Sequence, residues 1–173
     1  MKKSKCFLLA FWGMFLIAGN LLANQNMFAI YLPAESVGSY GELKKDVQHV
    51  KLRSTPILSI PDIISYSRKN HEIKITSNAY NRLIAMKKCT PFIVCLGRKR
   101  LYAGAFFMGI ESWPFNGVVI CTLCPSFKTH PKIDYNAIQL QLGYPTAEYF
   151  KGNDPRPNPS LFQVLEKAGK LKN

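Results

Sequence analysis

Short segments in which apolar and polar residues alternate predict a protein built largely from β-strands. The first is 27–33, which ends at Pro33, and another is 71–76, where Ile73 and Ile75 alternate with charged or polar residues. Further strands are predicted at 91–96, 101–107, 117–121 and 137–143. The sequence GRKR between the first two of these indicates the tip of a β-hairpin.

Two segments have the spacing of amphipathic helices. The first is 77–88, because a side-chain oxygen of either Thr76 or Ser77 can accept from the free N–H groups of its first turn. The second is 159–169, which follows a favourable N-cap residue, Asn158, and ends at a glycine. Both helices have an apolar face that must be covered by the sheet.

The predicted strands outnumber the helices, and several neighbouring strands look antiparallel. A weaker helical pattern at Tyr40, Leu43 and Val47 is interrupted by glycines, and 49–67 is predicted to form two extended pieces separated by prolines. The expected fold is therefore α+β, with a mixed or antiparallel sheet and helices on one side of it. No linker divides the chain, so residues 24–173 are expected to form a single compact domain.

The N-terminal residues have the pattern of a secretory signal peptide. Lysines at positions 2, 3 and 5 precede an apolar run from Cys6 to Ala18, and Ala23 offers a small residue for cleavage. We therefore expect 1–23 to be a signal peptide, with retention as a membrane anchor as the alternative. No later segment has the apolar length of a membrane span, so no transmembrane domain is expected after cleavage. Export places the protein in the periplasm, outside the cell or on the envelope.

The chain is basic, with a formal net charge of +13. For an exported protein this charge favours an anionic envelope surface or an envelope protein as partner over nucleic acid. The candidate contact residues are those of the hairpin tip and of the preceding helix end: Arg98, Lys99, Arg100, Lys87 and Lys88. The alternative is that these charges are solvated and serve solubility.

Four cysteines follow the predicted signal: Cys89, Cys95, Cys121 and Cys124. In an oxidising compartment they are candidates for disulfides, in any of three connectivities, or for packed small side chains. The CTLC motif also permits thiol redox chemistry, although Pro125 opposes the helix start that would activate Cys121. A zinc site would combine Cys121 and Cys124 with Cys89 and His130, at loose spacings.

The block 59–106 resembles a known family. It contains PDIISY, then HEIKITSNAYNRL, then PFIVCLGRKRLYAGAF. This order resembles the soluble head region of SecD-type protein-export membrane proteins. The whole exported chain, including IQLQLGYP and the closing LFQVLEKAGKLK, is similar to small exported bacterial proteins of unknown function. The positions that carry the likeness are Ile73, Ile75, Thr76, Ala79, Leu83 and Gly97. The resemblance implies a fold and a compartment, but not transport, because the chain lacks the multiple membrane helices of a translocase.

The sequence contains none of the common hydrolase motifs, neither G-x-S-x-G nor H-E-x-x-H nor S-x-x-K, and no phosphate-binding glycine loop. The function favoured by the sequence is therefore that of an exported, non-enzymatic domain that acts through protein or envelope contacts and needs no cofactor. The alternative is a thiol redox or zinc-binding protein that uses Cys121 and Cys124.

Overall fold

The computed structural model describes residues 27–35, 40, 43, 46–86, 89–122 and 136–173. The predicted signal peptide and four of the candidate site residues, Lys87, Lys88, Cys124 and His130, lie outside these ranges. Among the described residues, no helix has both the length and the apolar character needed to cross a bilayer.

The described chain forms a nine-stranded mixed sheet in the order β2-β1-β5-β6-β7-β8-β4-β3-β9. The strands are β1 Phe28–Tyr31, β2 Leu58–Ser59, β3 Ile63–Ser67, β4 Glu72–Ile75, β5 Pro91–Leu96, β6 Lys99–Phe107, β7 Phe115–Cys121, β8 Ala137–Tyr144 and β9 Leu171–Lys172. Neighbours are antiparallel except for the pairs β6–β7 and β3–β9, which are parallel. The expected α+β fold with a mixed sheet in one compact domain is confirmed.

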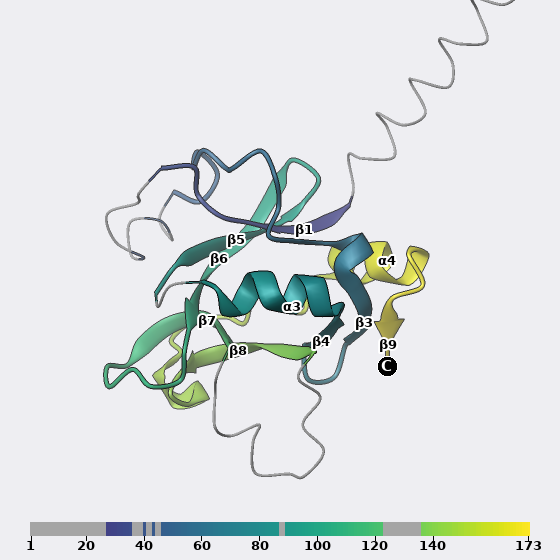
Figure 1. Ribbon diagram of the computed structural model, residues 1–173. Coiled ribbons are helices and arrows are strands. Elements are labelled where there is room, and N and C mark those ends of the chain that lie inside the picture. Colours follow the sequence, from purple (N-terminus) through teal and green to yellow (C-terminus); the bar gives the residue numbers. More distant parts are fainter. Residues whose placement is uncertain (1–26, 36–39, 41–42, 44–45, 87–88, 123–135) are drawn as a thin grey trace, which may run out of the picture.

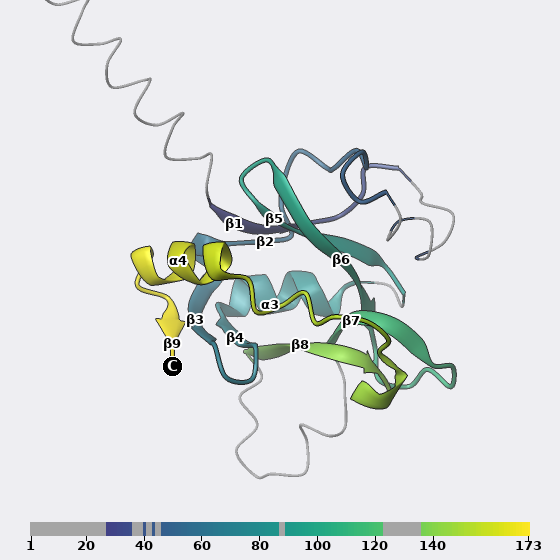
Figure 2. The ribbon, with the colours of Figure 1, turned by 180° about the vertical axis from the view of Figure 1, so that it is seen from behind.

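Two α-helices are present in the described ranges, α3 Ser77–Ile84 and α4 Pro159–Lys167. Short 3₁₀ turns, η2 Ile60–Asp62 and η4 Ala147–Tyr149, interrupt the connections. The sheet curves around α3, with β1, β5 and β6 above the helix and β8 and β4 below it (Figures 1 and 2). Both helices contribute to one core cluster with the sheet, so they lie on the same side of it, as predicted.

The main hydrophobic core fills the space between the helices and the inner face of the sheet. Ala79 and Leu83 of α3 and Leu161 and Leu165 of α4 are at most 1% exposed there. A second cluster on the outer face of β5 and β6 contains Leu43, with Tyr40 and Val47 packed against it. The apolar positions of the weaker helical pattern, Tyr40, Leu43 and Val47, therefore all pack against the same part of the sheet.

Helix α3 is shorter than predicted: it ends at Ile84, four residues before the expected end at Lys88. Its N-cap is Thr76, whose Oγ1 accepts from the backbone N–H of Ala79 at 3.3 Å. The hydroxyl of Ser77 is used differently, since it accepts from the side-chain amide of Asn136 at 3.3 Å on the surface. The structure thus decides between the two capping residues that the sequence left open.

We expect Thr76→Ala to lower the free energy of unfolding by about 1 kcal/mol, because the first turn of α3 loses its acceptor. Ser77→Ala removes only the exposed hydrogen bond and should change the stability by less than about 0.5 kcal/mol. Urea unfolding of both variants checks this, and a larger loss for Ser77→Ala would contradict the assignment of the cap.

Candidate functional site

The β5–β6 hairpin carries the predicted basic tip, hereafter the basic hairpin: Arg98, Lys99 and Arg100. The turn begins at Gly97, whose φ of 56° lies in the left-handed region that favours glycine. The backbone N–H of Gly97 donates to the carbonyl oxygen of Met27 at 2.8 Å. The hairpin tip therefore lies beside the start of β1, where the preceding N-terminal segment joins the domain.

Arg100 is held by the protein rather than presented to solvent. One of its guanidinium nitrogens, Nη2, donates to the carbonyl oxygen of Val50 at 2.9 Å. The side-chain amide of Gln48 donates to the carbonyl oxygen of Arg100 at 3.0 Å. Arg100 thus fixes the hairpin to the segment that packs over the outer face of the sheet, and its role in this geometry is structural.

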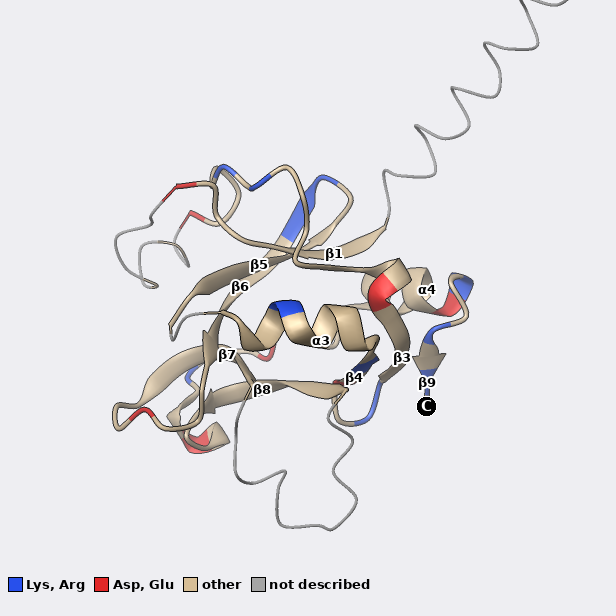
Figure 3. Cartoon of the chain, in the orientation of Figure 1, with Lys and Arg blue, Asp and Glu red and all other residues tan. Residues whose placement is uncertain are grey.

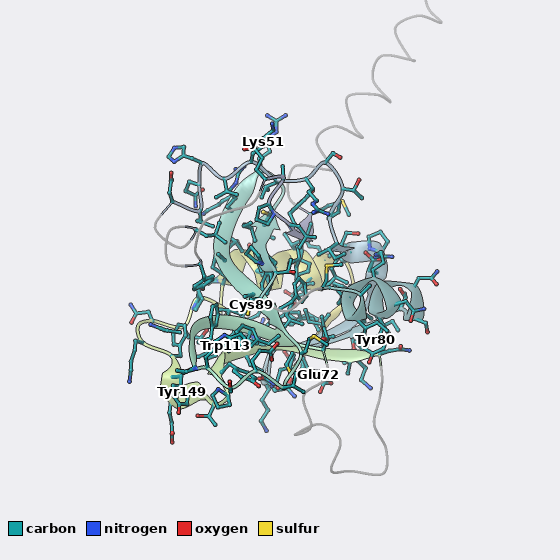
Figure 4. The ribbon with its side chains drawn as sticks, turned by 60° about the vertical axis from the view of Figure 1, so that its left-hand side comes forward. Lys51, Glu72, Tyr80, Cys89, Trp113 and Tyr149 are labelled. Atoms are coloured by element: carbon teal, nitrogen blue, oxygen red, sulfur yellow. The ribbon has the colours of Figure 1, made fainter. Side chains whose placement is uncertain are left out.

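Arg98 and Lys99 are exposed, and neither side chain has a hydrogen-bond or ion-pair partner among the described residues. Figure 3 shows further Lys and Arg positions on the loop next to the hairpin. Lys51 of this loop projects outward at the same end of the molecule (Figure 4). It reaches Glu35 at 3.3 Å, but both side chains are 76% exposed, so this ion pair is weak. Arg98 and Lys99 therefore form a solvated cationic surface at the tip of the basic hairpin.

The cysteines are distributed over two environments. Cys95 lies on β5, fully buried on the outer face of the sheet, and burial raises the pKa of its thiol to about 11 although the nearby Arg100 charge lowers it. Cys89 is exposed, and both Cys89 and Cys95 are present as thiols. No disulfide joins two of the described cysteines, which corrects the disulfide alternatives that use Cys89 or Cys95.

Cys121 is the last residue of β7 and is 6% exposed, so it belongs to a strand and not to a helix start. Cys89 and Cys121 reach the same end of the sheet on opposite sides of β6, through the contacts of Cys89 with Phe106 and of Cys121 with Phe107. Two strand spacings are about 10 Å, which is too far for a disulfide between their Cα atoms.

Cys121 is disulfide-bonded, and neither Cys89 nor Cys95 is its partner. Its pairing with Cys124 stays a prediction, because Cys124 lies outside the described residues. Zinc bound there with His130 would need this bond to be reduced.

A buried polar cluster at the β3–β4 turn was not predicted from the sequence. The hydroxyl of Tyr66 and Nδ1 of His71 form a hydrogen bond of 2.8 Å in the interior. His71 is 7% exposed, has a φ of 55°, and stacks on Phe162 of α4 with the ring centroids 6.3 Å apart. Arg68 covers the Phe162 ring, with its guanidinium carbon 4.9 Å from the ring centroid.

Asp154 and Arg156 lie in the loop before α4 and interact electrostatically with this cluster. Arg156 donates to both oxygens of Asp154, at 2.9 and 2.7 Å, and its Nη1 donates to the carbonyl oxygen of Leu140 in β8 at 2.6 Å. Burial alone would raise the pKa of Asp154, but the hydrogen bonds and charge of Arg156 lower it overall. The ion pair fixes the loop to the sheet, so we interpret the cluster as structural.

Sequence reasoning missed the cluster for an identifiable reason. His71 and Glu72 are the adjacent pair that the sequence offers, but Glu72 does not face His71 in the strand. The hydrogen-bond partner of His71, Tyr66, lies five residues earlier, across the β3–β4 turn, whereas Asp154 and Arg156 come from a distant segment of the chain. The one local signal was the concentration of turn-forming residues in NDPRPNP at 153–159, which is typical of a loop held in a defined conformation.

No family model matches the chain, and the comparisons with curated proteins and with solved structures find no match either. The likeness of 59–106 to the SecD-type head region therefore stays a prediction.

The two thiols should differ in reactivity. We expect maleimide to label Cys89 in the folded protein and Cys95 only after unfolding, because Cys95 is buried and its thiol pKa is raised. Peptide mapping by mass spectrometry identifies the labelled residues, and Cys89→Ser and Cys95→Ser are the matched controls. Labelling of Cys95 in the folded protein at the rate of Cys89 would contradict its burial. The same maps, with and without reductant, report whether Cys121 and Cys124 are oxidised.

The buried histidine should make stability depend on pH. Burial lowers the pKa of His71, the Arg156 charge lowers it further, and Asp154 opposes both. As pH falls through about 6.5, the unfolded chain gains a proton at this residue that the folded protein does not accept. The free energy of unfolding should therefore be lower at about pH 5.5 than at about pH 7.5. Asp154 stays ionised in both states over this window, since its pKa is lowered.

Denaturant unfolding of wild type and of His71→Asn at the two pH values checks this, because asparagine tolerates the positive φ and does not titrate. The difference between the pH values should shrink in His71→Asn. His49→Gln is the matched control on the surface, where the side chain of His49 is 82% exposed. If His49→Gln rather than His71→Asn removed the difference, the buried histidine would not be its source.

Proposed function

We propose that this protein is an exported, non-enzymatic α+β domain whose basic hairpin docks on anionic phospholipid headgroups of the cell envelope. One observation carries the proposal: the exposed cations Arg98 and Lys99 lie directly beside Met27, through the Gly97–Met27 hydrogen bond. The segment with the predicted export signal enters the domain at this residue.

The chain length before Met27 supports the same orientation. The apolar run ends at Ala18, and the nine residues that follow it up to Met27 reach at most about 30 Å when fully extended. An apolar run held by a membrane, whether before cleavage or as an anchor, thus keeps the basic hairpin near the headgroups. Each cation close to an anionic membrane surface contributes about 1 kcal/mol of binding, and this contribution falls within a Debye length.

The alternative function, thiol redox or zinc chemistry at Cys121 and Cys124, rests on the sequence motif. It gains no support from a described neighbour that would activate the thiols. The resemblance to the SecD-type head region supports only the part of the proposal that concerns export.

Flotation with vesicles of phosphatidylglycerol and phosphatidylcholine tests the proposal, with the protein as isolated from its native compartment. Wild type should bind phosphatidylglycerol vesicles more strongly at low salt than at high salt, and should not bind vesicles of pure phosphatidylcholine. The double variant Arg98→Gln, Lys99→Gln should lose about 2 kcal/mol of binding, roughly thirtyfold in the partition coefficient.

Lys69→Gln, Lys151→Gln is the matched control, because it removes two exposed cations away from the hairpin. Lys69 lies in the β3–β4 turn, and the backbone N–H of Lys151 donates to the side chain of Asn116 in β7. The control should bind nearly as wild type does. Equal losses in both double variants, or no binding of wild type to anionic vesicles, would overturn the proposal. Arg100 is left unchanged, since its replacement would loosen the hairpin itself.

A further inference from the structure

An apolar groove of about 480 Å³ lies beside α4, between this helix and Met27 just before β1, Ile60 of η2 and Leu96 at the end of β5. This volume is within the range of small-molecule sites. The lining residues are Met27, Ile60, Leu96, Ser160, Gln163, Val164, Lys167 and Ala168. Figures 1 and 2 both place α4, the start of β1 and the β5–β6 hairpin at the same end of the molecule.

The groove has an apolar floor and a polar edge. Met27, Ile60 and Val164 are only partly buried, while Lys167 is exposed at the edge. Leu96, another floor residue, immediately precedes the turn of the basic hairpin. A ligand in the groove therefore meets apolar side chains along its length and positive charge at Lys167, and the exposed Arg98 follows the lining residue Leu96 by two positions in the chain.

Strand β1 beside the groove has no open edge to which an extended peptide could add as a further strand. β1 is paired with β2 on one side and with β5 on the other, so its backbone groups are already used in the sheet. Strand addition needs an open edge. The groove thus fits a ligand that makes apolar contacts and has no backbone groups to satisfy, and its charges favour a negative end.

We propose that this groove binds the acyl chain of an anionic lipid, whose headgroup contacts Lys167 and the basic hairpin. The inference rests on the proposed membrane docking and deepens it. Docking by charge alone places the hairpin on the headgroups, whereas an acyl chain in the groove adds a contact that salt does not screen. Vesicle binding by the wild type should then retain a salt-resistant part.

A dansyl-labelled long-chain fatty acid is the probe, and dansylamide, which has the fluorophore without the chain, is its control. Wild type should enhance and blue-shift the fluorescence of the fatty acid but not of dansylamide. Ala168→Phe fills the groove without changing charge and should weaken fatty acid binding at least about tenfold. Ile84→Phe places the same ring on an exposed side chain of α3 and should leave the binding unchanged.

Circular dichroism shows whether Ala168→Phe is folded. If it is not, competition experiments on the wild type alone test the groove. Unlabelled long-chain fatty acids should displace the probe from wild type and short-chain ones should not. Equal displacement by both, unchanged binding in folded Ala168→Phe, or no enhancement by wild type would overturn the groove assignment. Vesicle binding that persists in any of these cases leaves the docking proposal standing, so the two failures are distinguishable.

Discussion

The burial of helix α3 inside the curve of the sheet is the constraint on which the rest of the structure depends. The helix is short, and its two fully buried residues, Ala79 and Leu83, need a surface that bends around them. Gly104 of β6 shows how closely that surface is packed. A Cβ there would lie 2.2 Å from the ring of Phe92 and 2.6 Å from the carbonyl oxygen of Val118, so only glycine permits this approach. On the outer face of β5 and β6, Leu43 packs in a separate cluster with Ile93, Cys95 and Ala103.

The same curvature brings distant parts of the chain to one end of the molecule. Because the sheet bends, α4 contacts β1 near one edge of the sheet and β9 at the other edge. Strand β9, which follows α4 in the chain, pairs with β3. The basic hairpin, the start of β1 and the groove beside α4 therefore share one end, although their sequences are separated by most of the chain. A surface with charge on one side and an apolar groove on the other arises there from packing.

Charge in this protein has different roles that depend on burial. Arg100 and Arg156 are basic residues, yet both are hydrogen-bonded to backbone carbonyls and hold loops to the sheet. Arg98 and Lys99 remain solvated and are available to a partner. Because a buried guanidinium without its partners would be costly, the two held arginines are stability elements. A count of basic residues therefore overstates the solvated cationic surface, which consists of the exposed residues alone.

The sequence by itself determined most of the secondary structure, since alternation and capping residues act locally: Ile73 and Ile75 mark β4, and Asn158 begins α4 through its side-chain hydrogen bond. It also indicated the exposed hairpin, because a turn between two apolar strands must be solvated. Tertiary structure alone decided the strand order, the short β9, the division between held and solvated arginines, and the positions of Asp154, Arg156 and Phe162 around His71. These depend on contacts between residues far apart in the chain, for which a local pattern carries no signal.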